Sequence, residues 1–260
     1  MTALHLIRVP IDTHALVRWA RERGWVRGRV VAFDEGRALH HLVDEVVGPG
    51  VLRPFRLLVP PRQPKGNLYA YSALAAESLR ADAQVQALPD HLSVLALDQL
   101  KSKPMPSDWR VGQRLGFDLR ARPVRRLRRD LEIPSGEPKR KGAEIDAFQV
   151  EALHRHPTDR EGMASENRTR EAVYLDWLTE RLTPAATLDH SASRLARFRR
   201  TRVARGEHGS EGPDATIHGT LTITDPTTFA TLLARGVGRH RAYGYGMLLL
   251  RSPNRPVPEH

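Results

Sequence analysis

The chain has 260 residues, enough for one large domain or two small ones. Hydrophobic residues make up 40% of it, which is enough for a buried core and excludes a wholly disordered protein. No apolar stretch approaches the ~18–20 residues that a membrane span needs. The first residues, MTALHLIRVPID, lack the layout of a secretory signal, so we expect a cytoplasmic protein. The absence of cysteine excludes disulfides, thiolate metal sites and a cysteine nucleophile.

Positive charge is concentrated in two segments. The formal net charge is +11 with 41 basic residues, nearly all of them arginine, although a GC-rich genome would favour arginine too. Residues 120–141 hold nine basic and three acidic side chains, and residues 194–205 hold six arginines and no acid. Because the rest of the chain is almost neutral, the pattern predicts a polyanion-binding surface. Two solvated basic loops are the alternative, and neither segment has the apolar face of a membrane-surface helix.

The N-terminal part alternates strand and helix signals. Capping aspartates and apolar spacing predict helices over residues 12–23 and 34–47, the second ended by Gly48-Pro49-Gly50. Apolar runs bounded by turn residues predict strands. These strands cover residues 4–9, 53–59, 68–74, 92–97 and 114–120, with a turn at 64–67. The initial order of strand, two helices and two strands is compatible with half of a ferredoxin-like fold.

The C-terminal part begins with the basic segment, whose proline and glycine content predicts an exposed loop. Helical spacing covers residues 144–155 and 170–182, separated by a polar stretch, which suggests an inserted helical hairpin. Strict alternation over residues 216–224 predicts a half-buried antiparallel strand. Asp225 and Pro226 then open a helix that ends at Gly236, and residues 247–251 form the last strand.

The connector over residues 236–246, GVGRHRAYGYG, is the most distinctive motif. Its four glycines permit positive φ and a close approach of the backbone to a phosphate. Arg239 and Arg241 offer charge, and Tyr243 and Tyr245 offer rings for base stacking. The connector runs from helix to strand and lacks GxGxxG spacing, so it is neither a dinucleotide fingerprint nor a Walker A loop. A flexible connection without ligand is the alternative.

Three blocks of the sequence resemble a known family. Residues 215–252, ending in LLARGVGRHRAYGYGMLLLRS, resemble the C-terminal signature of the RAMP superfamily of CRISPR-associated RNA-binding proteins. Residues 109–123, WRVGQRLGFDLRARP, and residues 174–182, YLDWLTERL, are similar to further blocks of its CasE branch, the repeat-RNA endonucleases. The blocks cover roughly a quarter of the chain, in the order typical of the family.

The resemblance implies an α+β fold of two tandem ferredoxin-like (RRM-like) domains with antiparallel sheets. We expect an N-terminal domain over residues 1–110 and a C-terminal domain over residues 111–260, with a helical insertion at about 140–183. The implied activity is cleavage of CRISPR precursor RNA beside the repeat hairpin, without metal or cofactor. The 2′-hydroxyl attacks the adjacent phosphate and leaves a 2′,3′-cyclic phosphate and a 5′-hydroxyl. The implied partners are the precursor, the mature crRNA hairpin and other effector subunits.

Cleavage of this kind needs a base, an acid and cations against the phosphorane charge. The helix over 34–47 offers Arg37 and His40, three residues apart on one face. CasE-like proteins carry a tyrosine three residues before the helix histidine, and Arg37 stands at that position here. The catalytic candidates are therefore Arg37, His40 and Arg241. Either His40 is the sole proton shuttle, or the site relies on arginines that hold the RNA in a strained geometry for in-line attack. An arginine in place of the family tyrosine is also compatible with a protein of a divergent type IV CRISPR system. We expect His41 to pair with Glu45 instead.

The remaining candidates are residues expected to contact RNA. They are Arg23, Arg122, Arg125, Arg126, Arg128, Arg129, Arg194, Arg197, Arg199, Arg200, Arg202, Gly236, Gly238, Arg239, His240, Tyr243, Gly244 and Gly246. No histidine pattern matches a metal motif, so we expect no metal site. Two alternative functions remain open, a non-cutting RNA-binding subunit of the same kind of complex, and a general DNA-binding protein.

Overall fold

The computed structural model describes residues 3–25, 33–133, 138–156, 159, 162, 168–203 and 210–253. Its first sheet, sheet A, has the strand order β2-β3-β1-β4, all antiparallel. Its elements are β1 (His5–Asp12), α1 (Thr13–Glu22), α2 (Glu35–Val47), β2 (Phe55–Leu58), β3 (Lys65–Ser72), α3 (Ala76–Gln86), α4 (Pro89–Val94), η1 (Leu97–Gln99) and β4 (Lys101–Pro104). This order and pairing is that of a ferredoxin-like fold.

The second sheet, sheet B, repeats this arrangement as β10-β5-β9-β8. Its elements are β5 (Arg114–Ala121), α7 (Arg170–Leu182), β8 (Ala186–Val203), β9 (Ser210–Ile223), α8 (Pro226–Arg235), η2 (Arg241–Tyr243) and β10 (Leu248–Arg251). A short hairpin of β6 (Val124–Arg126) and β7 (Glu144–Asp146), followed by α5 (Ala147–Arg155), stands between β5 and α7. The fold is thus α+β with two ferredoxin-like units, as expected.

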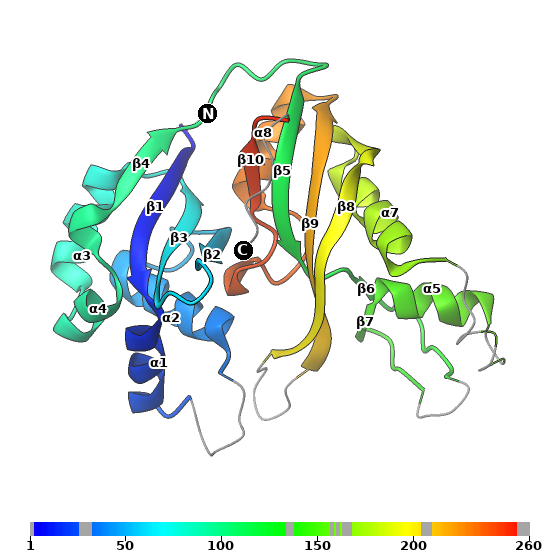
Figure 1. The fold of residues 1–260 in the computed structure, drawn as a ribbon, viewed down its shortest axis with the longest axis horizontal. Helices are drawn as coiled ribbons and strands as arrows, with labels where there is room; N and C mark the ends of the chain where they lie inside the picture. The colour runs from blue at the N-terminus through cyan, green and yellow to red at the C-terminus, as the bar shows by residue number, and fades with distance from the viewer. Residues whose placement is uncertain are drawn as a thin grey trace.

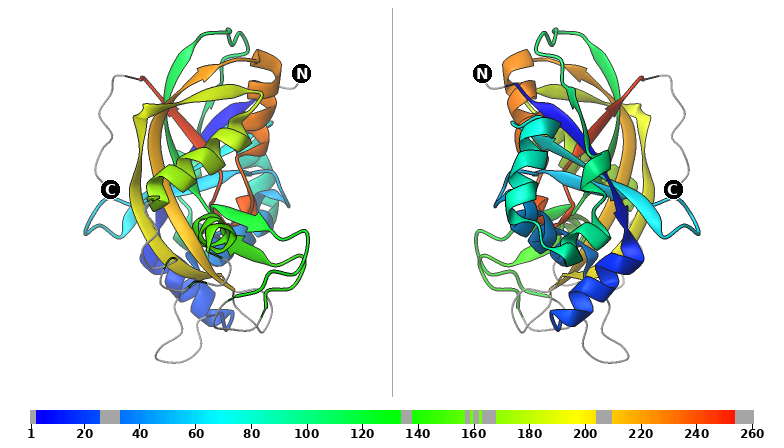
Figure 2. Two further views of the ribbon diagram at one scale, coloured as in Figure 1. Left: turned by 90° about the vertical axis from the view of Figure 1, so that its right-hand side faces the viewer. Right: turned by 90° about the vertical axis from the view of Figure 1, so that its left-hand side faces the viewer.

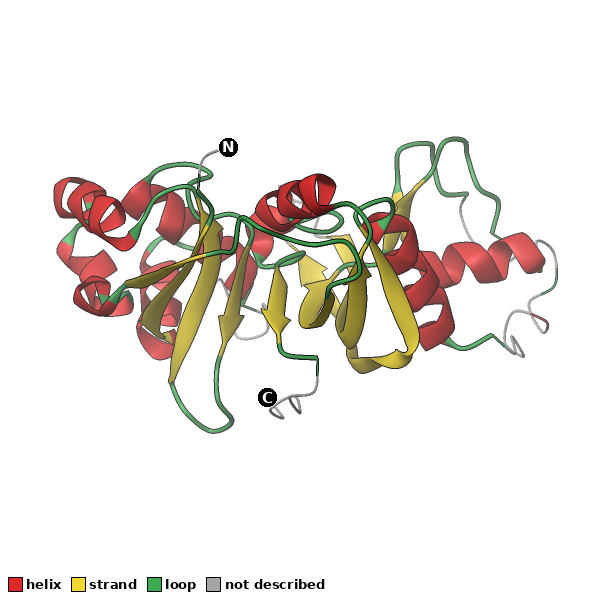
Figure 3. Ribbon diagram, turned by 90° about the horizontal axis from the view of Figure 1, so that it is seen from above, coloured by secondary structure: helices red, strands yellow, loops and turns green. Residues whose placement is uncertain are grey.

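Each sheet has its own core. Ile7, Leu16 and Leu42 are fully buried between sheet A and its helices, and Phe117, Trp177 and Leu233 are buried on the helical side of sheet B. Figure 1 shows α3 and α4 on the outer side of sheet A and α7 beside β8 at the other end. Seen from above, the two sheets lie between these outer helices (Figure 3). No helix within the described residues is long and apolar enough to cross a membrane.

The units contact each other through the faces that their outer helices leave uncovered. The Tyr71 hydroxyl of β3 donates to the Leu248 carbonyl of β10 at 2.9 Å, and Arg56 of β2 pairs with Asp118 of β5 at 3.0 Å. Tyr71, Arg56 and Asp118 are all buried. Figure 2 shows that α1 and the β6–β7 segment lie toward the same end of the molecule.

Four local predictions were wrong or incomplete. Residues 92–97 are not a strand, because Pro89 opens α4 and the His91 ring accepts a hydrogen bond from the Leu88 amide at 3.1 Å. The turn at 64–67 is mostly strand, since β3 already pairs with β1 from Lys65. The basic segment contains β6. The helix expected from 144 begins at Ala147, because Asp146 caps it by accepting from the Phe148 amide.

Candidate functional site

His40 lies on α2, whose start is fixed by the Asp34 carboxylate accepting from the Arg37 amide at 3.0 Å. Its side chain is 19% exposed, and its Nδ1 lies 3.0 Å from Arg53 Nη2 and 3.3 Å from Asp44 Oδ2. Arg53 also donates to the same Asp44 oxygen. When His40 is neutral, Arg53 makes Nδ1 an acceptor, so the ring proton belongs on Nε2. When it is charged, the Nδ1 proton is directed at Asp44.

The surroundings of His40 favour its neutral form. Burial lowers the pKa of His40 below its usual value; Asp44 opposes this shift, whereas Arg53 and then His41 add to it. The ring edge also packs on Tyr243, with centroids 5.2 Å apart. A neutral imidazole at neutral pH is suited to proton transfer.

Exchanging the two groups beside His40 is expected to move its pKa in opposite directions. Arg53→Gln removes a charge that lowers the pKa of His40 and leaves Asp44 unopposed, so the pKa rises. Asp44→Asn removes the opposing carboxylate, so the pKa falls. Titration of the His40 C2 proton by NMR measures both shifts, and shifts of the same sign in both variants would contradict this geometry.

The glycine-rich connector packs directly on the helix that carries His40. A Cβ atom added at Gly36 would lie 2.5 Å from the Tyr243 carbonyl oxygen, so only glycine permits this approach. Gly236, Gly238, Gly244 and Gly246 all have positive φ, as the sequence predicts. The C-terminal connector and the N-terminal helix therefore lie in direct contact, although they are far apart in the sequence.

Gly36→Ala tests this contact through stability. Alanine at an exposed helical site normally stabilises a helix by about 1 kcal/mol relative to glycine. Here the clash with Tyr243 is expected to outweigh that gain and lower the free energy of unfolding by about 1–3 kcal/mol. Urea denaturation measures the difference, and a more stable variant would show that the close approach is absent.

The space beside each connector glycine is filled by other atoms of the protein. An added Cβ would lie 2.9 Å from Trp177 at Gly238, 3.0 Å from Pro54 at Gly236 and 3.3 Å from Phe55 at Gly244. At Gly246 it would lie 2.4 Å from the Val237 carbonyl oxygen. The connector is thus a packed structure, and the expected open approach to a phosphate does not explain its glycines.

Some polar side chains of the connector are held by contacts within the protein, and others line a cavity. Glu144 of β7 accepts from Arg239 Nε and bonds His240 Nε2, each at 2.6 Å, and the His240 side chain is only 6% exposed. Burial raises the pKa of Glu144, but the His240 hydrogen bond and the charges of His240 and Arg239 outweigh it and lower the pKa. Tyr245 is 3% exposed, so its ring offers no stacking surface. His240 is likewise held inside the protein by its bond to Glu144.

Arg241 turns toward α8. Its Nη1 donates to the Arg235 carbonyl at 2.7 Å, and no contact joins it to His40 among the described residues. It lines a cavity of about 420 Å³ with arginines of β6, α7, α8 and the connector. We call this the arginine cavity; its five arginines are Arg126, Arg181, Arg235, Arg239 and Arg241. No acidic side chain is among the described residues that line it, which favours an anionic occupant.

The arginines of β8 are divided between ion pairs and exposed, unpaired positions within the described residues. Arg199 donates to Asp214 at 2.7 Å, and Arg200 lies 3.2 Å from Glu211, so both charges are partly neutralised. Arg194 and Arg197 are exposed. A smaller cavity of about 190 Å³ between the two sheets is lined by Arg197, Arg199, Arg120, Arg56 and Glu35, among others. The Arg202 side chain and residue 205 lie outside the described part of the chain.

The other predicted RNA-contacting arginines differ widely in exposure. Arg126, Arg128 and Arg129 are exposed, whereas Arg125 holds Glu180 through two hydrogen bonds of 3.0 and 2.6 Å. Arg122 is 3% exposed and so is unavailable to a ligand. Arg23 bridges Glu45 and Asp90 and covers the Trp19 ring.

Two expectations for α2 need correction or extension. Glu45 bonds His91 Nε2 at 3.0 Å and Arg23, and no ion pair joins it to His41 among the described residues; burial lowers the pKa of His41, and the Glu45 charge only opposes that shift. His41 instead packs on Trp25, with centroids 4.6 Å apart, and the Arg37 guanidinium lies 5.5 Å from the same ring. Arg37 thus lies on the histidine-bearing side of the helix, but no described contact joins it to His40.

Sequence reasoning missed the groups that hold the site together. Arg53 and Asp44 orient His40, and Arg120 links Asp214 to the connector, with its guanidinium 4.6 Å from the Tyr245 ring centre. Arg120 also lies 3.7 Å from Glu35 at the start of α2. The i, i+4 spacing of His40 and Asp44 was the one signal available. Among the described residues, no three histidines or carboxylates gather as a metal site.

Solved structures share this fold. Cse3, a CRISPR endoribonuclease bound to a 19-nucleotide RNA, has 18% identity and a TM-score of 0.58, covering 95% of this chain and 99% of that one. Thermus thermophilus Cse3, bound to an RNA representing a pre-cleavage complex, has 17% identity and a TM-score of 0.58, covering 96% and 99%. Cas6e from Escherichia coli strain K-12 has 18% identity and a TM-score of 0.53, covering 95% and 99%. At these identities the likeness is one of fold.

Sequence comparison supplies the assignment. No curated protein matches the sequence. The family model described as CRISPR associated protein matches residues 4–252, almost the whole chain. The chain therefore belongs to the CRISPR associated protein family.

Proposed function

We propose that this protein is a metal-independent endoribonuclease that cuts CRISPR precursor RNA at the repeat hairpin and stays bound to the product. The observation that carries the proposal is the contact of the connector with α2, which brings Tyr243 against His40, while other residues of the same connector line the arginine cavity. The family supports CRISPR RNA as the substrate, and the fold resembles that of Cse3 and Cas6e.

The proposed reaction needs no group from outside the chain. The 2′-hydroxyl attacks the neighbouring phosphorus, its proton leaves, and the 5′-oxygen is protonated as its bond to phosphorus breaks. His40 is the proposed proton-transfer group, because its ring is half-buried and held by Arg53 and Asp44. Arg37 and Arg241 are proposed to supply positive charge to the phosphorane or its neighbouring phosphates. Arg37 stands at the family's tyrosine position, and an arginine is a poor general base.

One assay tests the activity. The purified protein is incubated in EDTA with the repeat RNA from its own array, and the termini of the fragments are identified. Cleavage at a single position with a 5′-hydroxyl and a 2′,3′-cyclic phosphate supports the proposal. Tight binding of intact RNA supports the second candidate, a non-catalytic crRNA-binding subunit, which Arg37 in place of a tyrosine favours. Equal competition by plain duplex DNA at physiological salt would contradict both.

The exposed arginine cavity is expected to dominate the salt dependence of binding. Arg126 lines this cavity and has no ion pair among the described residues, whereas Arg200 is already paired with Glu211. Arg126→Ala is therefore expected to reduce the slope of log K against log salt by about one unit. Arg200→Ala, which removes the same charge, is expected to change it less. Filter binding at several salt concentrations compares them, and equal slopes would place the phosphates elsewhere.

A further inference from the structure

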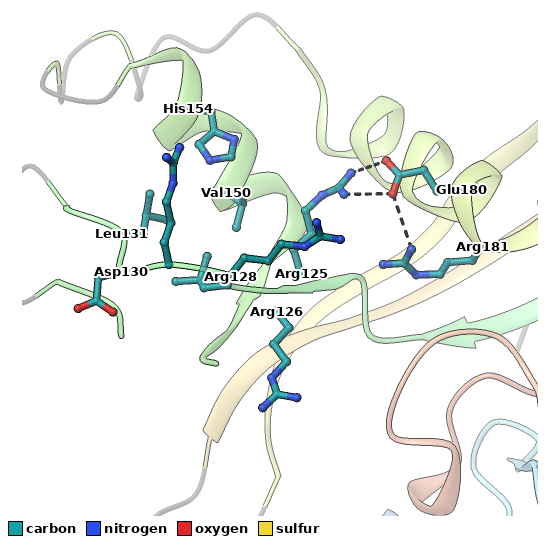
Figure 4. Close-up of a pocket in the computed structure, with 11 residues that line it drawn as sticks. Arg125, Arg126, Arg128, Asp130, Leu131, Val150, His154, Glu180 and Arg181 are labelled. Carbon is teal, nitrogen blue, oxygen red and sulfur yellow. Dashed lines mark hydrogen bonds and ion pairs between the residues drawn. The ribbon is translucent and has the colours of Figure 1, made fainter. Parts of the chain in front are cut away.

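A second cavity, separate from the site of His40, lies between the β6–β7 segment, α5 and α7 (Figure 4). We call it the insertion cavity, since it is built on the segment between β5 and α7. Its volume is about 480 Å³, which falls within the range of small-molecule sites. Its walls combine arginines with three apolar side chains, Leu127, Leu131 and Val150.

Arginines outnumber carboxylates in the lining of the insertion cavity, and several of these arginines have no ion pair among the described residues. Glu180 is engaged by the Arg125 fork and lies 3.7 Å from Arg181, and Asp130 accepts from Arg140 and from the Lys141 amide. Both carboxylates that line the cavity are therefore occupied by cations or amides. Arg128 and Arg129 are exposed, and neither has an ion pair among the described residues. An anionic group would gain charge-assisted hydrogen bonds from them.

The cavity also offers flat and apolar surfaces. Leu127, Leu131 and Val150 supply apolar contact, and Figure 4 shows Val150 and His154 projecting from the same helix. The Arg125 guanidinium is held in a fixed plane by both oxygens of Glu180. Guanidinium planes and imidazole rings are surfaces on which unpaired RNA bases stack. A ligand with a flat ring and a phosphate satisfies both halves of the cavity, whereas an acidic peptide would leave the ring surfaces unused.

The insertion cavity adjoins the proposed RNA site. Arg126 and Arg181 line both it and the arginine cavity. Figure 4 shows Arg126 directed away from Arg125 and Arg128. The arginine cavity borders the connector, which contacts the helix of His40 through Tyr243. The two cavities therefore share a wall, so a nucleotide in the insertion cavity can belong to the same RNA that the arginine cavity holds.

We propose that the insertion cavity takes one unpaired nucleotide of the bound RNA, with its base on the apolar and ring surfaces and its phosphate at Arg128 and Arg129. This inference rests on the proposed function, because it requires that the protein bind repeat RNA. It adds a specificity site to that function, since a single pocket for a base selects where an unpaired nucleotide occurs along the RNA.

The test replaces each unpaired nucleotide of the repeat RNA, in turn, with an abasic one. A 2′-deoxy sugar at the mapped scissile nucleotide blocks cleavage, so that binding alone is measured. Wild-type protein is expected to lose about 5- to 150-fold in affinity at one abasic position that the catalytic site does not account for, as for one stacked base. In Leu131→Trp, which fills the cavity, the same abasic change is expected to have little further effect.

Two further variants keep the outcome decisive. Val85→Trp adds the same ring at an exposed position of α3 (86% exposed), and it is expected to retain the full abasic penalty. His154→Ala removes one ring surface at an exposed helical position and is expected to reduce the penalty even if Leu131→Trp unfolds. If RNA binds tightly but neither cavity variant alters any abasic penalty, the insertion cavity is not a base site. If RNA does not bind at all, the proposed function itself fails.

Discussion

His40→Ala is expected to slow cleavage of repeat RNA by about 10²- to 10⁴-fold, the usual contribution of a positioned acid–base group. The affinity for the RNA is expected to change only a few-fold. The His40 side chain is only 19% exposed, so it contributes little contact area to a bound RNA. Single-turnover cleavage with saturating protein gives the rate, and binding of uncleavable RNA gives the affinity.

His41→Ala is the matched control for this result. It removes the same ring one position away on α2, where the side chain packs on Trp25 and lacks the Arg53–Asp44 pair that holds His40. We expect its cleavage rate to stay within about tenfold of wild type. A normal rate in His40→Ala would place the catalytic group elsewhere. A wild-type protein that binds and does not cut would favour the subunit function.

Local rules predicted the helix that carries the site. Asp34 as cap, the apolar spacing and the glycine stop give α2 its observed bounds, because these signals act between neighbours in the chain. The two-unit α+β fold was likewise expected, and the resemblance carried more of that prediction than periodicity did. Residues 92–97 do not form the expected strand. Pro89 and the His91 cap start helix α4 there, and these local signals override the strand tendency of a short apolar run.

The site itself could not be assembled from the sequence, because its contacts join distant segments. Nothing in the spacing of Gly36 and Tyr243 shows that they touch, and nothing marks Arg53 as the partner of His40. The role of the connector glycines was also misjudged. Positive φ was expected, but the space beside Gly238 belongs to Trp177, a residue of α7. Tertiary packing decides whether a glycine-rich loop faces a ligand or its own protein.

Asp214→Ala is expected to lower the free energy of unfolding by about 3–5 kcal/mol, the cost of leaving a buried charge without its partner. The Asp214 carboxylate is 4% exposed and accepts from Arg120 Nε and Nη2 at 2.9 and 2.8 Å and from Arg199 at 2.7 Å. Burial lowers the pKa of Arg120, but its bonds to Asp214 and the neighbouring Tyr245 and Glu35 outweigh this and raise it. In the variant Arg120 stays charged but loses both of its hydrogen bonds to Asp214, and Glu35, at 3.7 Å, is the remaining acidic partner among the described residues.

Two comparisons separate the buried charge from a simple loss of contacts. Glu211→Ala removes an acid on the same strand, but its pair with Arg200 is about 60% exposed on both sides, so urea denaturation is expected to show a loss below about 1 kcal/mol. Replacing both partners, Arg120→Met with Asp214→Leu, is expected to recover much of the stability lost in Asp214→Ala. Cleavage is expected to remain impaired in the double variant, because Arg120 also joins Tyr245 of the connector to Glu35 of α2, the helix that carries His40. Stability without activity would show that this ion network positions His40, whereas full recovery of both would reduce it to a structural element of sheet B.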